Sequence, residues 1–309
     1  MNLLEQAKQN TKRNAPLYIK LLSLFSVIRG YNILLLVLAQ YLASIFIFAP
    51  EKSAKDVIFD LDLYFIVLAT ISVIASGYII NNFYDSETDK INRPIKSKID
   101  AFVDQRTKLK IYFLLNFIGA LFGFMVSWRA GLFFSVYIFL IWFYSHKLKK
   151  YPLLGLFVAA ILSILPFFAV FVYFKNFSEI IFAHAAFLFF ILLIRQLLKD
   201  LESLRGDFTQ NYQTIPVKYG EQFTTILITL LILLTFNPIY FLLKFEGLGG
   251  MRYYFYFSIG FLALFGVFIW FAKNTMHYKV MHFLLKVLIA LGVLSISLID
   301  YSVIINKLI

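Results

Sequence analysis

Residues 81–94 read NNFYDSETDKINRP and follow directly on a long apolar segment. Within this stretch Asn81, Asp85 and Asp89 are spaced by four residues each. On an α-helix this spacing places the three side chains on one face, one turn apart. Mg2+ prefers oxygen ligands and is usually held by one or two carboxylates together with substrate phosphates. The stretch therefore predicts a magnesium site at the mouth of a membrane-spanning helix.

The composition is that of a polytopic membrane protein. Of the 309 residues, 61% are hydrophobic and only 15% are charged, which is outside the range of soluble domains. The chain has no Cys, which excludes disulfides, a thiol nucleophile and Cys-based metal sites. Basic loops on one side of a membrane explain the net charge of +12 better than nucleic-acid binding does. We therefore expect membrane lipids, and no nucleic acid, among the partners.

Nine apolar segments are long enough to cross a bilayer, at about 20 residues each. They fall at 22–49, 62–84, 108–127, 130–146, 152–174, 178–198, 222–243, 252–272 and 280–305. The third and fourth are separated by only three residues, which predicts a helical hairpin. We expect residues 1–309 to form a single domain, an all-α bundle of nine transmembrane helices around a central cavity. Residues 1–21 are expected to be a cytoplasmic N-terminal segment.

Lys and Arg residues are concentrated in alternate loops. Most lie in the N-terminal segment and in the loops after the second, fourth, sixth and eighth apolar segments. Because basic loops stay in the cytoplasm, this bias predicts a cytoplasmic N-terminus and a cytoplasmic location for every loop that carries a motif. We expect an integral protein of a plasma membrane, of the bacterial inner-membrane type, with its active site on the cytoplasmic side.

A second polar cluster, RQLLKDLESLRGD, occupies residues 195–207 and closes the sixth apolar segment on the same side as the first. Asp200, Ser203 and Asp207 lie near one helical face, at offsets of three and four residues, whereas Glu202 points elsewhere. Two acidic clusters that face each other across a bundle can hold two metal ions with a diphosphate clamped between them. The alternative for either cluster alone is an ordinary charged helix end at the membrane surface.

Basic residues accompany these acids. Arg29 lies within the first apolar segment with Asn32 on the same face, and an Arg there either snorkels to the interface or serves a polar cavity. The loop YSHKLKK at 144–150 is either a positive-inside anchor with an interfacial Tyr or a phosphate clamp built from lysines. The four histidines, at 146, 184, 277 and 282, show no metal-ligand spacing, so we expect them in interfacial or packing roles.

These motifs resemble the signatures of the UbiA superfamily of intramembrane prenyltransferases, whose members have nine transmembrane helices. The first signature matches at Asn81, Asp85, Asp89 and the following Asn-Arg-Pro, with Asn82 where the family usually carries Asp. The second is similar at Arg195, Lys199, Asp200, Gly206 and Asp207, and departs at Gln196 and Ser203, where the family carries Glu and Asp. Arg29 with Asn32, and the loop from Tyr144 to Lys149, resemble further family motifs.

The resemblance implies a Mg2+-dependent prenyltransferase that moves an isoprenoid chain from an allylic prenyl diphosphate to a lipid or small-molecule acceptor. It implies catalytic roles for Asp85, Asp89 and Asp207. The implied metal ligands are Asn81, Asp85, Asp89, Asp200 and Asp207. The implied substrate-binding residues are Arg29, Asn32, Asn81, Arg93, Tyr144, Lys147, Lys149, Arg195 and Lys199.

The motifs do not fix the acceptor. Their form looks most like that of geranylgeranylglycerol-phosphate geranylgeranyltransferases, and an aromatic acceptor, as in quinone synthesis, is the alternative. A hypothesis from a different class is an ion-coupled transporter or lipid-binding membrane protein whose acidic helix ends bind a coupling ion. Transporters of that kind often show internal repeat symmetry near the bilayer midplane. The sequence shows no such symmetry, which favours the enzyme.

Overall fold

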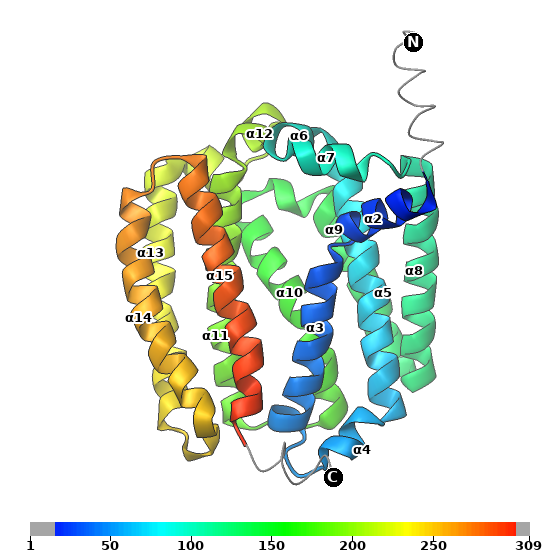
Figure 1. Cartoon of the computed structure of the whole chain (residues 1–309), viewed down its shortest axis with the longest axis vertical. Helices are drawn as coiled ribbons and strands as arrows, with labels where there is room; N and C mark the ends of the chain where they lie inside the picture. The colour runs from blue at the N-terminus through cyan, green and yellow to red at the C-terminus, as the bar shows by residue number, and fades with distance from the viewer. Residues whose placement is uncertain (1–15, 301–309) are drawn as a thin grey trace.

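The computed structural model describes residues 16–300, and every regular element within them is a helix. Nine of these helices are long and apolar enough to cross a membrane, as the hydropathy pattern predicts. They run between the two ends of the molecule and surround its centre (Figure 1). The predicted all-α bundle of nine transmembrane helices is therefore confirmed for the described part of the chain.

The long helices are α3 (Gly30–Ala43), α5 (Leu61–Tyr84), α8 (Gln105–Val126), α9 (Trp128–His146), α10 (Pro152–Phe174), α11 (Glu179–Glu202), α13 (Ile215–Lys244), α14 (Arg252–Phe268) and α15 (Thr275–Ser295). A π-helical turn, η1 (Ser44–Phe48), extends α3. The short helices are α2 (Leu17–Val27), α4 (Ala54–Ile58), α6 (Ser86–Asn92), α7 (Pro94–Asp100) and α12 (Leu204–Thr209). Short 3-10 turns are η2 (Leu148–Lys150), η3 (Glu246–Met251), η4 (Ile269–Phe271) and η5 (Ile296–Leu298).

Side-chain caps set several helix boundaries. Asp60 begins α5, because its Oδ1 accepts a hydrogen bond from the Leu63 N–H at 3.0 Å. Ser127 both ends α8 and begins α9: its N–H donates to the Gly123 carbonyl, and its Oγ accepts from the Ala130 N–H at 3.1 Å. The predicted hairpin is therefore confirmed, with Ser127 alone between its two helices.

The predicted first segment, 22–49, is not one helix. α2 ends at Val27, and Arg29 takes a left-handed backbone conformation with a φ of 51° before α3 begins. Such a conformation costs a residue with a side chain about 1–2 kcal/mol, so the break is held by its surroundings. α2 lies across the end of the bundle whereas α3 runs along it (Figure 1). Part of the predicted segment 1–21 belongs to α2, and residues 1–15 lie outside the described range.

A proline shapes the wall of the central cavity. Pro166 in the middle of α10 has no N–H, so the carbonyl of Leu162, one turn earlier, has no helical partner. The Tyr137 hydroxyl of α9 donates to that carbonyl at 2.7 Å. In a membrane every backbone polar group has to be satisfied within the protein. All three residues line the cavity, so this bond fixes α9 against α10 at its wall.

Candidate active site

The first acidic motif sits at a helix break rather than on one continuous helix. α5 ends at Tyr84, Asp85 has a φ of −90° and a ψ of 6°, and α6 begins at the next residue. Hydrogen bonds of helical type continue through the break, from the Asp85 N–H to the Asn81 carbonyl and from the Asp89 N–H to the Asp85 carbonyl. The three side chains therefore stay about one turn apart across the break.

The second motif has the same local design. α11 ends at Glu202, Ser203 has a φ of −98° and a ψ of 6°, and α12 begins at the next residue. The Ser203 N–H donates to the Lys199 carbonyl and the Asp207 N–H donates to the Ser203 carbonyl, each at 3.0 Å. Each motif thus ends a long membrane helix with one non-helical residue and a short turned helix.

Asn92 joins the two motifs. Its Nδ2 donates to the Ser203 carbonyl at 3.1 Å, and its Oδ1 accepts from the Gly206 N–H at the same distance. A Cβ on Gly206 would lie 2.4 Å from the Asn92 amide nitrogen, so only glycine allows this approach. α6 and α12 accordingly pack against each other at one end of the bundle (Figure 1). The predicted facing of the two acidic clusters follows from this clamp.

Asp85 has two polar partners from other elements. Its Oδ1 accepts hydrogen bonds from the Lys149 Nζ at 2.5 Å and from the Tyr212 hydroxyl at 3.3 Å. Lys149, which is buried, also donates to the Asn81 Oδ1 at 3.4 Å. The loop lysine that the sequence offered as a phosphate clamp thus lies between two candidate metal ligands. Lys147, by contrast, is exposed on the surface and does not line the cavity.

Of the other acids, Asp200 and Asp207 are buried and held by polar side chains, and Asp89 is half-buried. Burial raises the pKa of Asp207 to about 6, and the Ser203 hydroxyl donates to its Oδ2 at 2.8 Å. Burial and the nearby Asp85 charge raise the pKa of Asp89. Asp200 accepts a hydrogen bond from the Gln196 Nε2 at 2.9 Å. An ionised Glu at position 196 could not donate this bond. Several carboxyl groups lie close together here, which favours the binding of a cation.

The donor atoms fit Mg2+. They are carboxylate and amide oxygens, which hard divalent cations prefer. Within residues 16–300, no three acidic or histidine side chains form a ready-made metal cluster, so the five predicted ligands are not brought together as one set. Mg2+ usually takes one or two protein carboxylates and completes its shell with water and substrate phosphates. The two motifs therefore fit ions whose remaining ligands come from a diphosphate.

A cavity of about 620 Å³ lies beside the motifs in the centre of the bundle. Its polar end is lined by Arg29, Asn32, Tyr78, Asn81, Arg93, Lys96, Tyr144, Arg195, Gln196, Lys199, His282 and Lys286. Most of its remaining wall is apolar and includes Phe48, Phe167, Phe168, Phe171, Phe182, Phe187 and Phe255. A polar cap over an apolar channel suits a ligand with an anionic head and a long hydrocarbon tail.

The structure gathers most of the predicted substrate-binding residues at this cap and adds others that the sequence did not single out. His282 was expected to be an interfacial or packing residue, but its Nδ1 lies 2.7 Å from the Glu202 Oε2 and it lines the cavity. Lys286, on the same helix, also lines the cavity. A lone Lys or His in an apolar segment carries no motif, so only its place in the three-dimensional fold reveals it.

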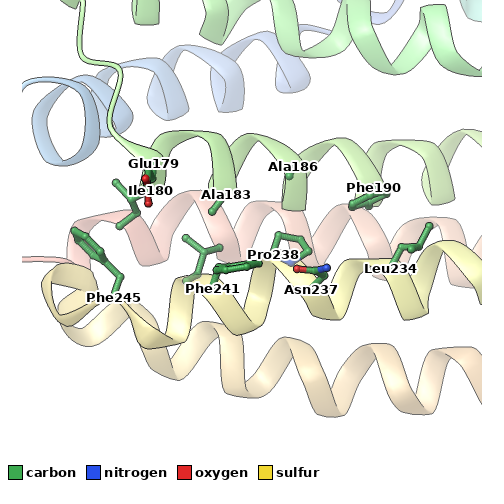
Figure 2. A pocket seen from close by; sticks show the side chains of 11 residues that line it. Glu179, Ile180, Ala183, Ala186, Phe190, Leu234, Asn237, Pro238, Phe241 and Phe245 are labelled. Carbon is green, nitrogen blue, oxygen red and sulfur yellow. The ribbon is translucent and has the colours of Figure 1, made fainter.

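A second cavity, of about 440 Å³, lies between α11 and α13 (Figure 2). Its wall is almost entirely apolar, with Asn237 and Glu179 as its polar residues. Glu179 begins α11, at the opposite end of that helix from Lys199 and Asp200. No residue of either acidic motif lines this second cavity, whereas Asn81, Arg195 and Lys199 line the central one.

The fold and the site define an intramembrane enzyme for substrates with an anionic head and an apolar tail. Residues 37–288 match the UbiA prenyltransferase family, which is most of the chain. The chain belongs to the UbiA prenyltransferase family, and it is a prenyltransferase. This membership favours the enzyme over the transporter hypothesis.

Similar proteins and solved structures agree with this placement. The chain is 27% identical over 217 residues to the digeranylgeranylglyceryl phosphate synthase of Methanobrevibacter smithii, covering 67% of this chain and 73% of the relative. It is 30% identical over 213 residues to that of Sulfolobus acidocaldarius, covering 65% and 72%. Its fold matches a structure of digeranylgeranylglyceryl phosphate synthase with a TM-score of 0.65 at 18% identity, covering 90% of this chain and 97% of that one.

A second solved structure shares the fold to the same degree. It is a UbiA homolog from Archaeoglobus fulgidus bound to GPP and Mg2+, with a TM-score of 0.65 at 15% identity. The match covers 89% of this chain and 99% of the homolog.

Proposed function

We propose that this prenyltransferase moves a geranylgeranyl group from geranylgeranyl diphosphate to a hydroxyl of a glycerol phosphate lipid that already carries one such group. The observation that carries the proposal is the central cavity, whose cationic cap lies beside two acidic motifs and whose wall is otherwise apolar. The names of the relatives supply the product, because a digeranylgeranylglyceryl phosphate contains one geranylgeranyl group more than its acceptor.

The acidic motifs are the proposed metal sites. Asp85, Asp89 and Asp207 would hold Mg2+, with Asn81 assisting and Asp200 beside Asp207. When bound there, Mg2+ neutralises the charge that develops on the leaving diphosphate. Lys149 would then exchange the Asp85 oxygen for a phosphate oxygen, since its ammonium already lies between two candidate ligands.

The cationic cap binds and orients the donor. Lys199, Arg29 and Arg93 line the polar end, where they would bind diphosphate oxygens. Asn32, whose Nδ2 donates to the Tyr78 hydroxyl at 3.3 Å, and Tyr144 complete the polar wall beneath them. The phenylalanine-rich wall takes the isoprenoid tail and excludes water from the reacting carbon.

The chemistry is a substitution at the allylic carbon. The bond from that carbon to the diphosphate oxygen breaks, and the diphosphate leaves with the electron pair. The acceptor hydroxyl oxygen forms a new bond to the carbon and loses its proton. The residues of this chain contribute position and charge, while the apolar wall of the cavity shields the developing cation from water.

The basic loops favour an orientation in which the polar cap faces the cytoplasm of a plasma membrane. The helices α6, α7 and α12 lie at one end of the bundle (Figure 1), and their sequences contain Lys90, Lys96, Lys98 and Arg205. The soluble diphosphate would then leave into the compartment where prenyl diphosphates are made.

A product assay tests the proposal. Purified protein in detergent is incubated with labelled geranylgeranyl diphosphate, Mg2+ and one acceptor at a time: geranylgeranylglyceryl phosphate, its phosphate-free alcohol, or 4-hydroxybenzoate. We expect a doubly prenylated glycerol phosphate product that EDTA abolishes and fresh Mg2+ restores. Transfer to the aromatic acceptor and none to the glycerol lipid would instead make this an aromatic prenyltransferase.

A further inference from the structure

The polar end of the cavity holds more positive charge than the acidic motifs balance. Arg195 of α11 and Lys286 of α15 both line the cavity. Across the described residues, neither forms an ion pair with a carboxylate. Charged side chains inside a membrane are rare and face a partner or a polar cavity that uses them.

The surroundings of Lys286 are themselves cationic. Its ammonium is repelled by Arg29, Arg93 and Arg195 and attracted by Glu202. That carboxylate is already engaged on both oxygens, by the Arg93 Nη2 at 3.2 Å and by the His282 Nδ1 at 2.7 Å. Glu202 is therefore shared among several cations. Arg29 and Arg93 also interact with Asp89, whereas no carboxylate of the described residues forms an ion pair with Arg195 or Lys286.

Lys286 is not a snorkelling anchor. It lies eleven residues beyond Thr275, the first residue of α15, which places it about 16 Å along the helix axis. It also lines the cavity rather than the lipid-facing surface. A lysine that only anchors a helix would lie near its end with its head group at the interface.

The cationic cluster is distinct from the metal sites. Lys199 is attracted by the charges of Asp200 and Asp207, whereas Arg195, one turn earlier on α11, interacts with Arg29 and Tyr78 instead. Arg29 interacts with Asp89 as well as with Lys286. The site thus has an acidic part, formed by Asp85, Asp89, Asp200 and Asp207 beside the cavity, and a cationic part, formed by Arg195 of α11 and Lys286 of α15 in the cavity wall. Arg29 interacts with both parts.

We propose that Arg195 and Lys286, with His282 beside them, form a second anion subsite that binds the phosphate of the acceptor lipid. This subsite rests on the proposed function, in which the donor diphosphate binds at the acidic part with its metal ions. A phosphate group matches two cations that lack a carboxylate partner, and both substrate tails then share one apolar cavity. Anchoring the acceptor by its phosphate sets its nearby hydroxyl toward the allylic carbon.

Lys286→Met tests the subsite by separating the two substrates. With geranylgeranylglyceryl phosphate as acceptor, we expect its KM to rise about tenfold or more, because a charge-assisted hydrogen bond is lost. The KM for geranylgeranyl diphosphate should change less than about twofold. With the phosphate-free alcohol as acceptor, wild type and variant should have the same acceptor KM. Lys279→Met, an exposed lysine on the same helix, is the matched control and should leave both KM values unchanged.

Direct binding separates failure of the subsite from failure of the proposed function. Binding of geranylgeranylglyceryl phosphate to the full-length protein in nanodiscs is measured by calorimetry with EDTA present, where no transfer occurs. Binding that weakens in Lys286→Met supports the subsite even if no acceptor is ever prenylated. Transfer by wild type with unchanged acceptor KM and binding in the variant overturns the subsite and leaves the function intact.

Two further outcomes also decide the matter. Equal loss of donor and acceptor affinity in Lys286→Met would assign the cluster to the donor diphosphate and overturn the proposal. Lys286→Gln serves if the Met variant is not monodisperse after purification, since it removes the charge while keeping a polar side chain in the cavity. The same rise in acceptor KM is expected for it, and its absence counts equally against the subsite.

Discussion

Asp85 is the residue on which the polar contacts of the candidate site converge. It occupies the break between α5 and α6, and it accepts hydrogen bonds from Lys149 and Tyr212. These partners come from the loop after α9 and the loop after α12, so one carboxylate ties three parts of the chain together. A Mg2+ ion bound to Asp85 Oδ1 would therefore have to displace Lys149 from that oxygen.

Replacing Asp85 by Asn keeps the shape of the side chain and removes its charge. We expect at least about a 100-fold loss of transfer, because the metal contributes several kcal/mol of charge stabilisation. Initial rates are measured with saturating Mg2+, and the thermal melting profile in detergent verifies folding. Asp56→Asn, an exposed acid on α4, is the control and should keep wild-type rates. Wild-type turnover in Asp85→Asn would remove this residue from the metal site.

Asp207 predicts a pH dependence of the Mg2+ requirement. Burial raises its pKa to about 6, so the protonated form, which is a poor metal ligand, grows as the pH falls through this value. Mg2+ affinity is therefore full above about pH 7 and is lost as the pH decreases. From pH 7.5 to pH 5.0 we expect the Mg2+ concentration for half-maximal activity to rise about tenfold. Burial also raises the pKa of Asp89, so its protonation at low pH should weaken Mg2+ binding in the same way.

The control for this titration is Asp207→Asn, which carries no titrating carboxyl at that position. Its Mg2+ requirement should be high at every pH and should vary less between pH 7.5 and pH 5.0 than that of the wild type. A wild-type Mg2+ requirement that stays constant over this range would contradict the role of Asp207.

At the level of helices, the two acidic motifs have the same local backbone structure. Each long helix is followed by a single non-helical residue, Asp85 after α5 and Ser203 after α11. The backbone angles of these two residues are nearly the same. A short helix then turns across the end of the bundle, and Asn92 holds α6 and α12 together. The second copy has a hydroxyl where the first has a carboxylate, and this hydroxyl positions Asp207. The site is therefore asymmetric in charge though similar in backbone.

Gly206→Ala tests the clamp between these helices. The added Cβ would lie 2.4 Å from the Asn92 amide nitrogen, so the Asn92 side chain has to leave its two hydrogen bonds or α6 and α12 have to separate. Overpacking of this kind destabilises by about 1–3 kcal/mol, and transfer activity should fall with it. Gly260→Ala on α14 is the matched control, because within the described structure its Cβ meets no atom within 4 Å. Melting temperature and initial rate are measured for both variants. Equal behaviour of the two would show that the Asn92 contact does not hold the motifs.

Hydropathy alone predicted the nine spanning helices, because span length and apolar content are local properties of a sequence. The helix breaks at Arg29 and Asp85 were missed, since apolar or helix-compatible residues surround both and the packing of short helices decides them. The role of Asn82 likewise depends on residues that are distant in the sequence. Asn82 donates to Asp100 at 3.0 Å and accepts from Lys108 at 2.9 Å, and an ionised acid at this position could not donate to Asp100.

The sequence predicted those site residues that belong to a motif. It missed those that only the three-dimensional fold brings to the site. Both acidic clusters follow from spacing, and the structure brings them to one end of the bundle (Figure 1). Lys286 and His282 stand far along the chain from either motif, in a helix whose pattern is that of any apolar span. Their proximity to Arg195 depends on how α15 packs against α11, which spacing within one segment does not encode.

For the whole molecule, the two ends of the bundle differ in what they carry. One end holds α6, α7 and α12 with both motifs, and the other holds α4 and the turn before α11 (Figure 1). The apolar channel starts at the motif end and runs into the bundle between α3, α10, α11 and α15. A diphosphate group would therefore bind at the motif end, and its apolar tail would lie deeper in the bundle. The basic loops predict that the motif end faces the cytoplasm.

The predicted orientation can be tested on intact cells, because the chain has no Cys of its own and any introduced thiol is the only one it carries. Lys98→Cys on α7 and Lys55→Cys on α4 replace exposed lysines at opposite ends of the bundle (Figure 1). A membrane-impermeant maleimide should label the Lys55→Cys variant and spare Lys98→Cys, since the motif end is expected in the cytoplasm.

After permeabilisation both variants should label equally, which controls for the reactivity of each thiol. Transfer activity of each variant close to that of the wild type verifies that the labelled protein is native. Labelling of Lys98→Cys alone in intact cells would invert the topology. The diphosphate would then be bound and released outside the cytoplasm, and the soluble donor pool could not reach the cap directly, so an inverted result would also remove the cytoplasmic delivery route from the proposed reaction.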